Sequence, residues 1–187
     1  MKNRILMRWV FLVFAFALCA LQGVSQAGAK DVSRKSVVDY FYLLPDSYFE
    51  VPQSKAQRKA VLFHDRKIYP YDFAVESIAD VKNDYARISL DAVGTLEVAV
   101  YRYKGRDLIA VRRYYEGCTV RFLTYKNGRW KDVTKQVMPV RLDRKYDYIL
   151  PRYGTITEVR RDLWPSEKRG RKVYDLLWQK GRFQVRH

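Results

Sequence analysis

The alternation of hydrophobic and polar residues is clearest between residues 95 and 132, where short runs of β-branched and aromatic residues are separated by glycine turns. Runs of this kind are typical of an antiparallel β-meander. The sharpest break is Asn127-Gly128, because both residues tolerate the positive φ angles of a type I′ hairpin turn. Successive side chains of a strand point to opposite faces. Leu96 and Val98 therefore share a face that we expect to be buried, whereas the other face mixes tyrosine, arginine and small apolar residues.

A first helix is expected before the meander, in residues 31–44. Val37 and Phe41 recur there at helical spacing, and a proline follows the segment directly. Proline disfavours helical geometry in the residue before it, so the helix should end at this point. Either Ser33 or Ser36 is expected to cap the start of the helix by accepting backbone N–H bonds.

A second helix is expected in residues 52–63, with Ser54 as its N-cap. Ala56, Ala60 and Phe63 form a narrow apolar stripe, and mostly basic residues cover the remaining surface. A basic amphipathic helix can lie on an anionic membrane. The alternative is a helix packed on the sheet with a solvated basic outer face. We favour this alternative because the apolar stripe is small and lacks bulky anchors.

Turn signals along the chain predict roughly seven to nine strands, with a terminal hairpin made of residues 173–178 and 183–185. The order of the elements indicates an α+β domain, in which two amino-terminal helices pack on a mainly antiparallel β-meander. Such a sheet can curl towards a barrel-like form, which would hide its edges.

Residues 1–29 are expected to be a secretory signal peptide. Three basic residues precede an uncharged apolar run, residues 9–21, which is short for a membrane span, and a small-x-small cleavage site ends at Ala29. The alternative is an uncleaved amino-terminal anchor. Cleavage would leave residues 30–187 as one domain without a membrane span, either periplasmic or secreted.

Composition adds a strong basic charge and a single remaining cysteine. The chain has 36 basic and 20 acidic residues, and removal of three basic residues with the signal peptide leaves 33 basic residues and a net charge of +13. Cys118 would then be the one cysteine, so no intramolecular disulfide can form. A lone cysteine can be a nucleophile or a dimer-forming thiol. We favour a small buried side chain at the start of a strand, because no second cysteine or neighbouring histidine supports chemistry.

The chain offers few residues for catalysis. Its two histidines are His64, at the end of the second helix, and His187, at the carboxyl terminus. No ligand spacing suggests zinc or copper, and there is no glycine-rich phosphate loop. We therefore predict no catalytic residue, no metal site and no cofactor. The rival hypothesis is a hydrolase of cell-wall material or polysaccharide, in which carboxylates distant in sequence converge in space.

Basic residues alternate with aromatic residues in three stretches, residues 101–104, 112–115 and 141–146. Surfaces of this kind bind nucleic acids, which an exported protein rarely meets, so we do not expect nucleic acid as the partner. The leading hypothesis is an exported, non-enzymatic binding protein for an anionic envelope polymer, a lipid headgroup or a protein partner. Alternatively, the excess charge only keeps the domain soluble. The sequence does not indicate an oligomeric state.

One basic loop and the strand before it form the predicted anion contact. Glycine allows the backbone of this loop to bend towards a phosphate or carboxylate, and unpaired charges should remain exposed. The residues assigned to this contact are Arg160, Arg161, Lys168, Arg169, Arg171 and Lys172.

Two segments carry a resemblance to other proteins. Residues 41–49 read FYLLPDSYF, and residues 125–134, which end the meander, read YKNGRWKDVT. With the basic helix between them, they resemble a loose set of uncharacterised exported bacterial proteins. The resemblance implies a bacterial and periplasmic setting, and it implies no catalytic residue.

Overall fold

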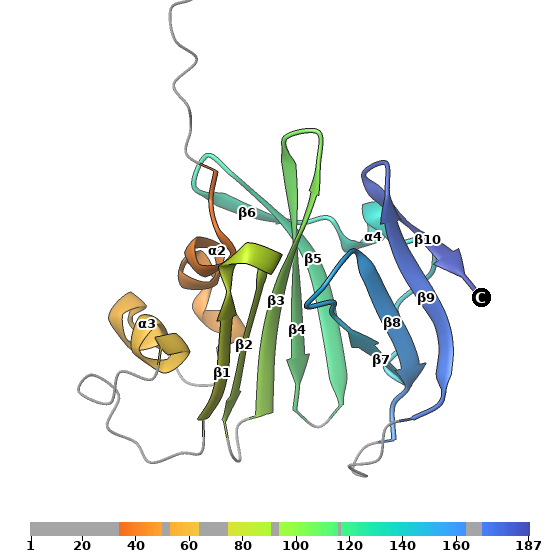
Figure 1. The fold of residues 1–187 in the computed structure, drawn as a ribbon, viewed down its shortest axis with the longest axis horizontal. Coiled ribbons are helices and arrows are strands. Elements are labelled where there is room, and N and C mark those ends of the chain that lie inside the picture. Colours follow the sequence, from red (N-terminus) through yellow and green to blue (C-terminus); the bar gives the residue numbers. More distant parts are fainter. Residues whose placement is uncertain (1–33, 50–52, 64–74, 91–93, 116, 164–169) are drawn as a thin grey trace, which may run out of the picture. The chain divides into compact units, whose positions relative to one another are not determined.

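The computed structural model describes residues 34–49, 53–63, 75–90, 94–115, 117–163 and 170–187 (Figure 1). The chain divides into two compact units, residues 1–34 and 35–187, and every element named below belongs to the second unit. The predicted signal peptide and His64 lie outside the described residues.

The described elements comprise three α-helices, two 3-10 turns and ten strands. The helices are α2 (Val37–Leu43), α3 (Lys55–Phe63) and α4 (Thr134–Val137), and the turns are η1 (Asp46–Tyr48) and η2 (Val81–Asn83). The strands are β1 (Val75–Asp80), β2 (Tyr85–Leu90), β3 (Gly94–Tyr103), β4 (Arg106–Tyr114), β5 (Cys118–Lys126), β6 (Arg129–Asp132), β7 (Tyr146–Ile149), β8 (Ile156–Arg161), β9 (Lys172–Gln179) and β10 (Arg182–Arg186).

The strands form two antiparallel sheets. The first has the order β1-β2-β3-β4-β5-β6 and the second has the order β10-β9-β8-β7. In Figure 1, α2 and α3 lie on one side of the first sheet and the second sheet lies on the other. The α+β class and the antiparallel meander are thus confirmed. The ten described strands exceed the expected seven to nine. They form two sheets, whereas we expected one curled sheet.

Both faces of the first sheet are buried, so the sheet separates two hydrophobic cores. On one face, Val98 packs in a cluster with Phe41 from α2. On the other face, Tyr101 packs in a cluster with Phe183 from β10, and its hydroxyl is hydrogen-bonded to the hydroxyl of Thr157. The mixed face of the meander is therefore a second core, because the carboxy-terminal sheet covers it.

A capping box at Ser36, one of the two predicted caps, starts α2, so the helix begins later than residue 31. The Ser36 Oγ accepts a hydrogen bond from the Asp39 backbone N–H at 3.2 Å, and the Asp39 carboxylate accepts one from the Ser36 backbone N–H at 2.8 Å. These reciprocal bonds satisfy two backbone donors that have no partner inside the helix. Leu44 has an extended ψ of 142° before Pro45, so the predicted end of the helix is confirmed.

The cap of α3 is confirmed, and of its predicted apolar stripe Ala60 is buried, whereas Ala56 and Phe63 are exposed. Ser54 Oγ accepts a hydrogen bond from the Gln57 backbone N–H at 3.2 Å. Phe63, which we assigned to the buried stripe, is 50% exposed, whereas Val61, Leu62 and Arg58 are buried. The buried face of the helix therefore carries the bulky side chains of Val61 and Leu62 together with Arg58.

Arg58 joins α3 to the end of α2. Its guanidinium donates to the backbone carbonyl of Tyr42 at 3.0 Å and to the carbonyl of Leu44, and it pairs with the Asp46 carboxylate. The guanidinium carbon also lies 4.1 Å from the centre of the Phe49 ring, a cation–π contact. Carbonyls at the end of a helix have no partner inside the helix, so this arginine satisfies two acceptors that would otherwise be unpaired.

The turns of the meander follow the sequence closely. Asn127 and Gly128 have φ angles of 52° and 75°, which confirms the predicted turn with positive φ at both positions. The β3–β4 and β9–β10 hairpins close with Lys-Gly pairs in the same region of φ. The same local chemistry therefore shapes three hairpins in the two sheets.

Candidate functional site

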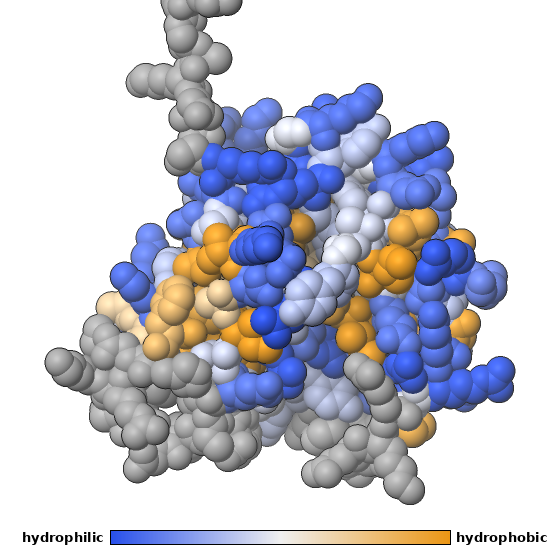
Figure 2. Space-filling view, viewed as in Figure 1, coloured by the Kyte–Doolittle hydropathy of each residue, from blue (hydrophilic) through white to orange (hydrophobic). Residues whose placement is uncertain are grey.

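Charge alone does not mark a site in this chain. Figure 2 shows hydrophilic residues over most of the viewed face, with hydrophobic residues gathered around α2 and α3 and beside the second sheet. The formal net charge of the chain is +16. A candidate site therefore has to be recognised where basic side chains converge on a concave surface.

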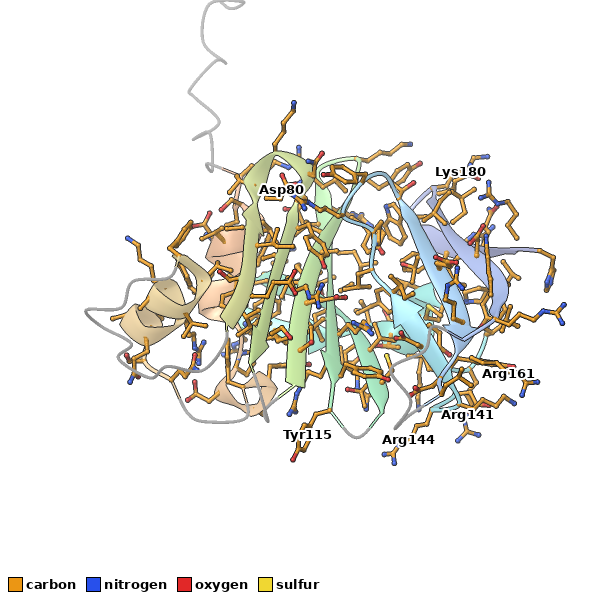
Figure 3. All side chains as sticks on the ribbon, turned by 60° about the horizontal axis from the view of Figure 1, so that its bottom comes forward. Asp80, Tyr115, Arg141, Arg144, Arg161 and Lys180 are labelled. Carbon is orange, nitrogen blue, oxygen red and sulfur yellow. The ribbon has the colours of Figure 1, made fainter. Side chains whose placement is uncertain are left out.

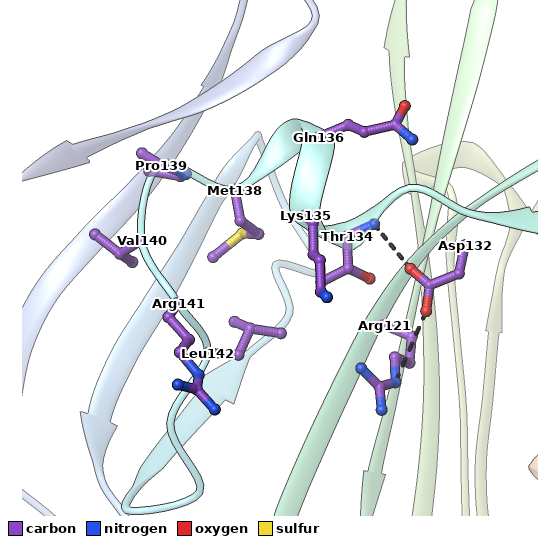
Figure 4. A pocket seen from close by; sticks show the side chains of 10 residues that line it. All are labelled: Arg121, Asp132, Thr134, Lys135, Gln136, Met138, Pro139, Val140, Arg141 and Leu142. Carbon is purple, nitrogen blue, oxygen red and sulfur yellow. Dashed lines mark hydrogen bonds and ion pairs between the residues drawn. The ribbon is translucent and has the colours of Figure 1, made fainter.

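One such surface is a groove of about 990 Å³ beside α4 (Figure 4). We call it the α4 groove. Its walls come from β5, the end of β6, α4 and the segment that follows α4. The lining residues are Arg121, Asp132, Thr134, Lys135, Gln136, Met138, Pro139, Val140, Arg141 and Leu142.

Hydrogen bonds to β5 and β6 hold α4 in place. The Thr134 backbone N–H donates to the Asp132 carboxylate at 2.8 Å, and the Thr134 hydroxyl accepts from the Phe122 backbone N–H at 2.9 Å. Thr134 itself is buried. Because the start of α4 is fixed to β5 in this way, the next residue, Lys135, is held beside the exposed Arg121.

Three cations line the α4 groove. In Figure 4, Lys135 and Arg121 extend into it from α4 and β5, and Arg141 enters from the opposite wall. Asp132 is the one acidic lining residue, and its carboxylate lies 3.9 Å from Arg121. Within the described part of the chain, Lys135 and Arg141 form no ion pair. The described lining is thus positively charged overall.

The remaining wall of the α4 groove is apolar. Met138 and Leu142 are partly buried against the second core, and Val140 is 38% exposed. Pro139, between Met138 and Val140, is exposed as well. No aromatic side chain belongs to the described lining, so the groove combines basic with aliphatic groups and differs from the basic-aromatic surface that we expected.

The structure brings the described residues of the predicted anion contact together: the Arg161 backbone N–H donates to the Arg171 carbonyl at 3.0 Å, and Arg160 pairs in register with Lys172. Arg160 pairs with Glu158 and donates to the backbone carbonyl of Gly170 at 2.9 Å, and Lys172 pairs with Asp175 at 2.9 Å. Both cations therefore already have acidic partners. Arg161 and Arg171 are exposed, whereas Lys168 and Arg169 lie outside the described residues.

Gly170 has a different role from the one that we assigned to it. The residue is buried, and a Cβ atom there would lie 2.0 Å from the backbone carbonyl oxygen of Arg161. Glycine is thus required for the close approach of two backbone segments. This part of the loop packs on β8.

Arg161 belongs to a second basic cluster next to the α4 groove. Arg161 pairs in register with Tyr146, and the Asp162 N–H donates to the carbonyl of Lys145 at 2.9 Å. Figure 3 shows Arg141, Arg144 and Arg161 at the same end of the second sheet. The basic stretch 141–146 of the sequence therefore lies at the candidate site. Arg121 and Lys135 were missed, because each is isolated in sequence among unrelated neighbours.

In the other two basic-aromatic stretches Tyr101 and Arg112 are buried, whereas Lys104 and Tyr115 are exposed. Arg112 is buried between two carboxylates: its guanidinium lies 3.0 Å from Glu97 and 2.8 Å from Asp147. Burial alone would lower the pKa of Arg112, but Glu97, Cys118 and Asp147 outweigh it and raise the pKa. Arg112 therefore stays charged and links the two sheets.

Cys118 is buried at the start of β5, as expected. Burial raises the pKa of its thiol to about 12, so the thiol is protonated at neutral pH. A thiol in this state is a poor nucleophile, which agrees with a packing role.

Asp80 and Asp143 do not suit the general acid of a catalytic carboxylate pair. Hydrogen bonds from Asn83 and Arg152 lower the pKa of Asp80, and hydrogen bonds from Lys145 lower the pKa of Asp143. A general acid needs a raised pKa, so neither residue suits that role. No cluster of His, Cys, Asp and Glu among the described residues could hold a metal ion.

No described helix has the length and apolar character that a membrane span requires. No known protein family, curated protein or solved structure matches this chain.

Proposed function

We propose that this chain is an exported, non-enzymatic binding protein that holds an anionic component of the bacterial envelope in the α4 groove. The observation that carries the proposal is the convergence of Arg121, Lys135 and Arg141 from three separate segments on one concave surface. Like charges that line one groove repel each other, and a bound anion would replace that repulsion with attraction. Asp132 compensates only part of the positive charge.

The neighbouring cluster of Arg144, Arg161 and Lys145, of which Lys145 is paired with Asp143 at 3.0 Å, supports the same conclusion. It extends the positive surface from Arg141 along the end of the second sheet. An anionic polymer or a membrane surface could therefore contact both the groove and this cluster. The alternative hydrolase needs carboxylates that converge on a substrate, whereas Glu97 and Asp147 converge on Arg112.

A binding experiment tests the proposal. The residues Arg121, Lys135 and Arg141 would be replaced together by glutamine, and binding of labelled polyphosphate would be measured at low and high salt. Exposed ion pairs contribute about 0.2–1 kcal/mol each, so the triple variant should bind about 3–100-fold more weakly at low salt. Binding by the wild type should also weaken as salt rises, because added ions screen the attraction.

A matched variant controls for the loss of total charge. Arg106, Lys126 and Arg129 are exposed at hairpin turns and do not line the α4 groove, and their replacement by glutamine removes the same charge. This control should bind polyphosphate nearly as well as the wild type. Equal losses in the two triple variants would contradict the proposal and would indicate that binding follows the total charge and not the α4 groove. Thermal unfolding of all three proteins would verify that the fold is retained.

A further inference from the structure

We propose that the ligand of the α4 groove is an amphiphile with an anionic headgroup and a single hydrocarbon chain. This inference rests on the proposed function and specifies the ligand of the same site. It follows from the apolar residues that line the groove, Met138, Pro139, Val140 and Leu142. Attraction between charges does not explain why a site for a polyanion would contain them.

The apolar half of the α4 groove is only partly used by the fold. Val140 belongs to neither core cluster and is one of the large hydrophobic residues exposed in the described chain. Met138 and Leu142 contact the second core with part of their surface and line the groove with another part. Apolar surface left in contact with water is unfavourable, so a ligand that covers it gains binding energy.

The polar and apolar groups occupy different parts of the groove. In Figure 4, the ends of Arg121, Lys135 and Arg141 lie lower in the view than Met138 and Val140, and Leu142 lies between Arg141 and Arg121. A ligand that spans the groove would therefore meet positive charge at one end and aliphatic side chains at the other. An anionic headgroup joined to a hydrocarbon chain has this distribution of charge.

The size of the groove agrees with a small ligand. Its volume of about 990 Å³ lies near the upper end of the range of about 300–1,000 Å³ that is common for ligand pockets. Such a volume suits one molecule with a short chain. An acidic peptide with an apolar side chain is the competing ligand, and the affinities of the two kinds of probe distinguish them.

Calorimetric titration with three soluble probes below their micelle concentrations tests this inference. Decyl phosphate has both features of the proposed ligand, inorganic phosphate has only the charge, and decyl maltoside has only the chain. The wild type should bind decyl phosphate at least about tenfold more tightly than either other probe, because each buried methylene adds affinity. The heat capacity change on binding should be negative, since apolar surface is buried.

Two single variants locate the chain of the probe. Val140→Ser should weaken the binding of decyl phosphate about 3–10-fold and leave the binding of polyphosphate unchanged. Val173→Ser is the matched control, because Val173 is 37% exposed, close to the 38% of Val140, and does not line the groove. Arg141→Gln should weaken both decyl phosphate and polyphosphate.

The outcomes distinguish this inference from the proposed function. Equal affinities for decyl phosphate and inorganic phosphate would refute the proposal of an amphiphilic ligand. The proposed anion site would still stand if the groove triple variant bound polyphosphate more weakly than the control variant. Equal effects of Val140→Ser and Val173→Ser, or equal binding of decyl maltoside and decyl phosphate, would also overturn it. An acidic, apolar peptide that binds more tightly than decyl phosphate would assign the groove to a peptide. The proposed function would be refuted if the groove triple variant and the control variant bound polyphosphate equally well.

Discussion

Replacing Arg112 with methionine should destabilise the domain strongly. Arg112 is 8% exposed and forms hydrogen bonds of 2.8 and 3.0 Å to one Asp147 oxygen, while Glu97 lies 3.0 Å from its guanidinium. Methionine keeps most of the aliphatic stem but removes the charge. The variant therefore leaves Asp147 without this cation near the junction of the two sheets, and of the described cations Glu97 keeps only Arg87, whose guanidinium lies 3.8 Å away.

The structure indicates the size of this effect. Breaking a buried ion pair by removing one partner costs about 3–5 kcal/mol, because the remaining charge stays desolvated. The side chain of Glu97 is 7% exposed and that of Asp147 is 19% exposed. Water can therefore solvate the charge of Asp147 better than that of Glu97. For a domain of this length, a loss of that size lowers the melting temperature by about 6–20 °C.

Urea unfolding followed by tryptophan fluorescence would measure the change in free energy. Arg106→Met is the control, because Arg106 is exposed and loses the same charge. Adding Glu97→Gln to Arg112→Met should restore part of the stability, since one unpaired charge is then neutral. The reasoning would be refuted if Arg112→Met and Arg106→Met had the same unfolding midpoint.

Three further predictions concern a turn, an acid-sensitive pair and export. Gly128→Val should destabilise the domain by about 1–3 kcal/mol, because a β-branched residue is strained at positive φ; an unchanged melting temperature would contradict this. Burial would raise the pKa of Asp175, but hydrogen bonds from Lys172 and Arg186 outweigh it and lower the pKa. The stability that Asp175 contributes is therefore present above its unfolded pKa of about 3.9 and is lost as the pH falls through the lower folded value. Asp175→Asn should flatten the loss of stability below about pH 4, and identical acid titrations of the two proteins would disprove it. Expression of the full chain in bacteria should yield a secreted or periplasmic product that begins near Lys30, whereas a membrane-bound product that retains Met1 would support the uncleaved anchor.

Local structure could be predicted where the controlling interactions are local. Ser36 and Ser54 cap their helices through residues three positions away, and Asn127-Gly128 closes its hairpin by its own backbone preference. The pattern of β-branched runs likewise located the strands of the meander. These features depend on a few neighbouring residues, so the sequence specifies them directly.

Features that depend on distant residues could not be predicted. Arg58 looks like an ordinary surface arginine in the sequence, and its burial depends on carbonyls that α2 brings to it. The inward position of Tyr101 depends on β8, β9 and β10, which begin more than fifty residues later in the chain. A hydrophobic pattern shows which faces can be buried but not which segment covers them.

The candidate site shows the same division. The sequence by itself determined the excess of basic charge, the turns, the helix caps and the α+β class, because composition and short-range preferences are enough for each of them. Only the tertiary structure decided which cations act together. It left Arg160 and Lys172 with acidic partners and brought Arg121, Lys135 and Arg141 to one groove. Convergence of side chains depends on long-range strand pairing and packing, and these are properties of the whole folded chain.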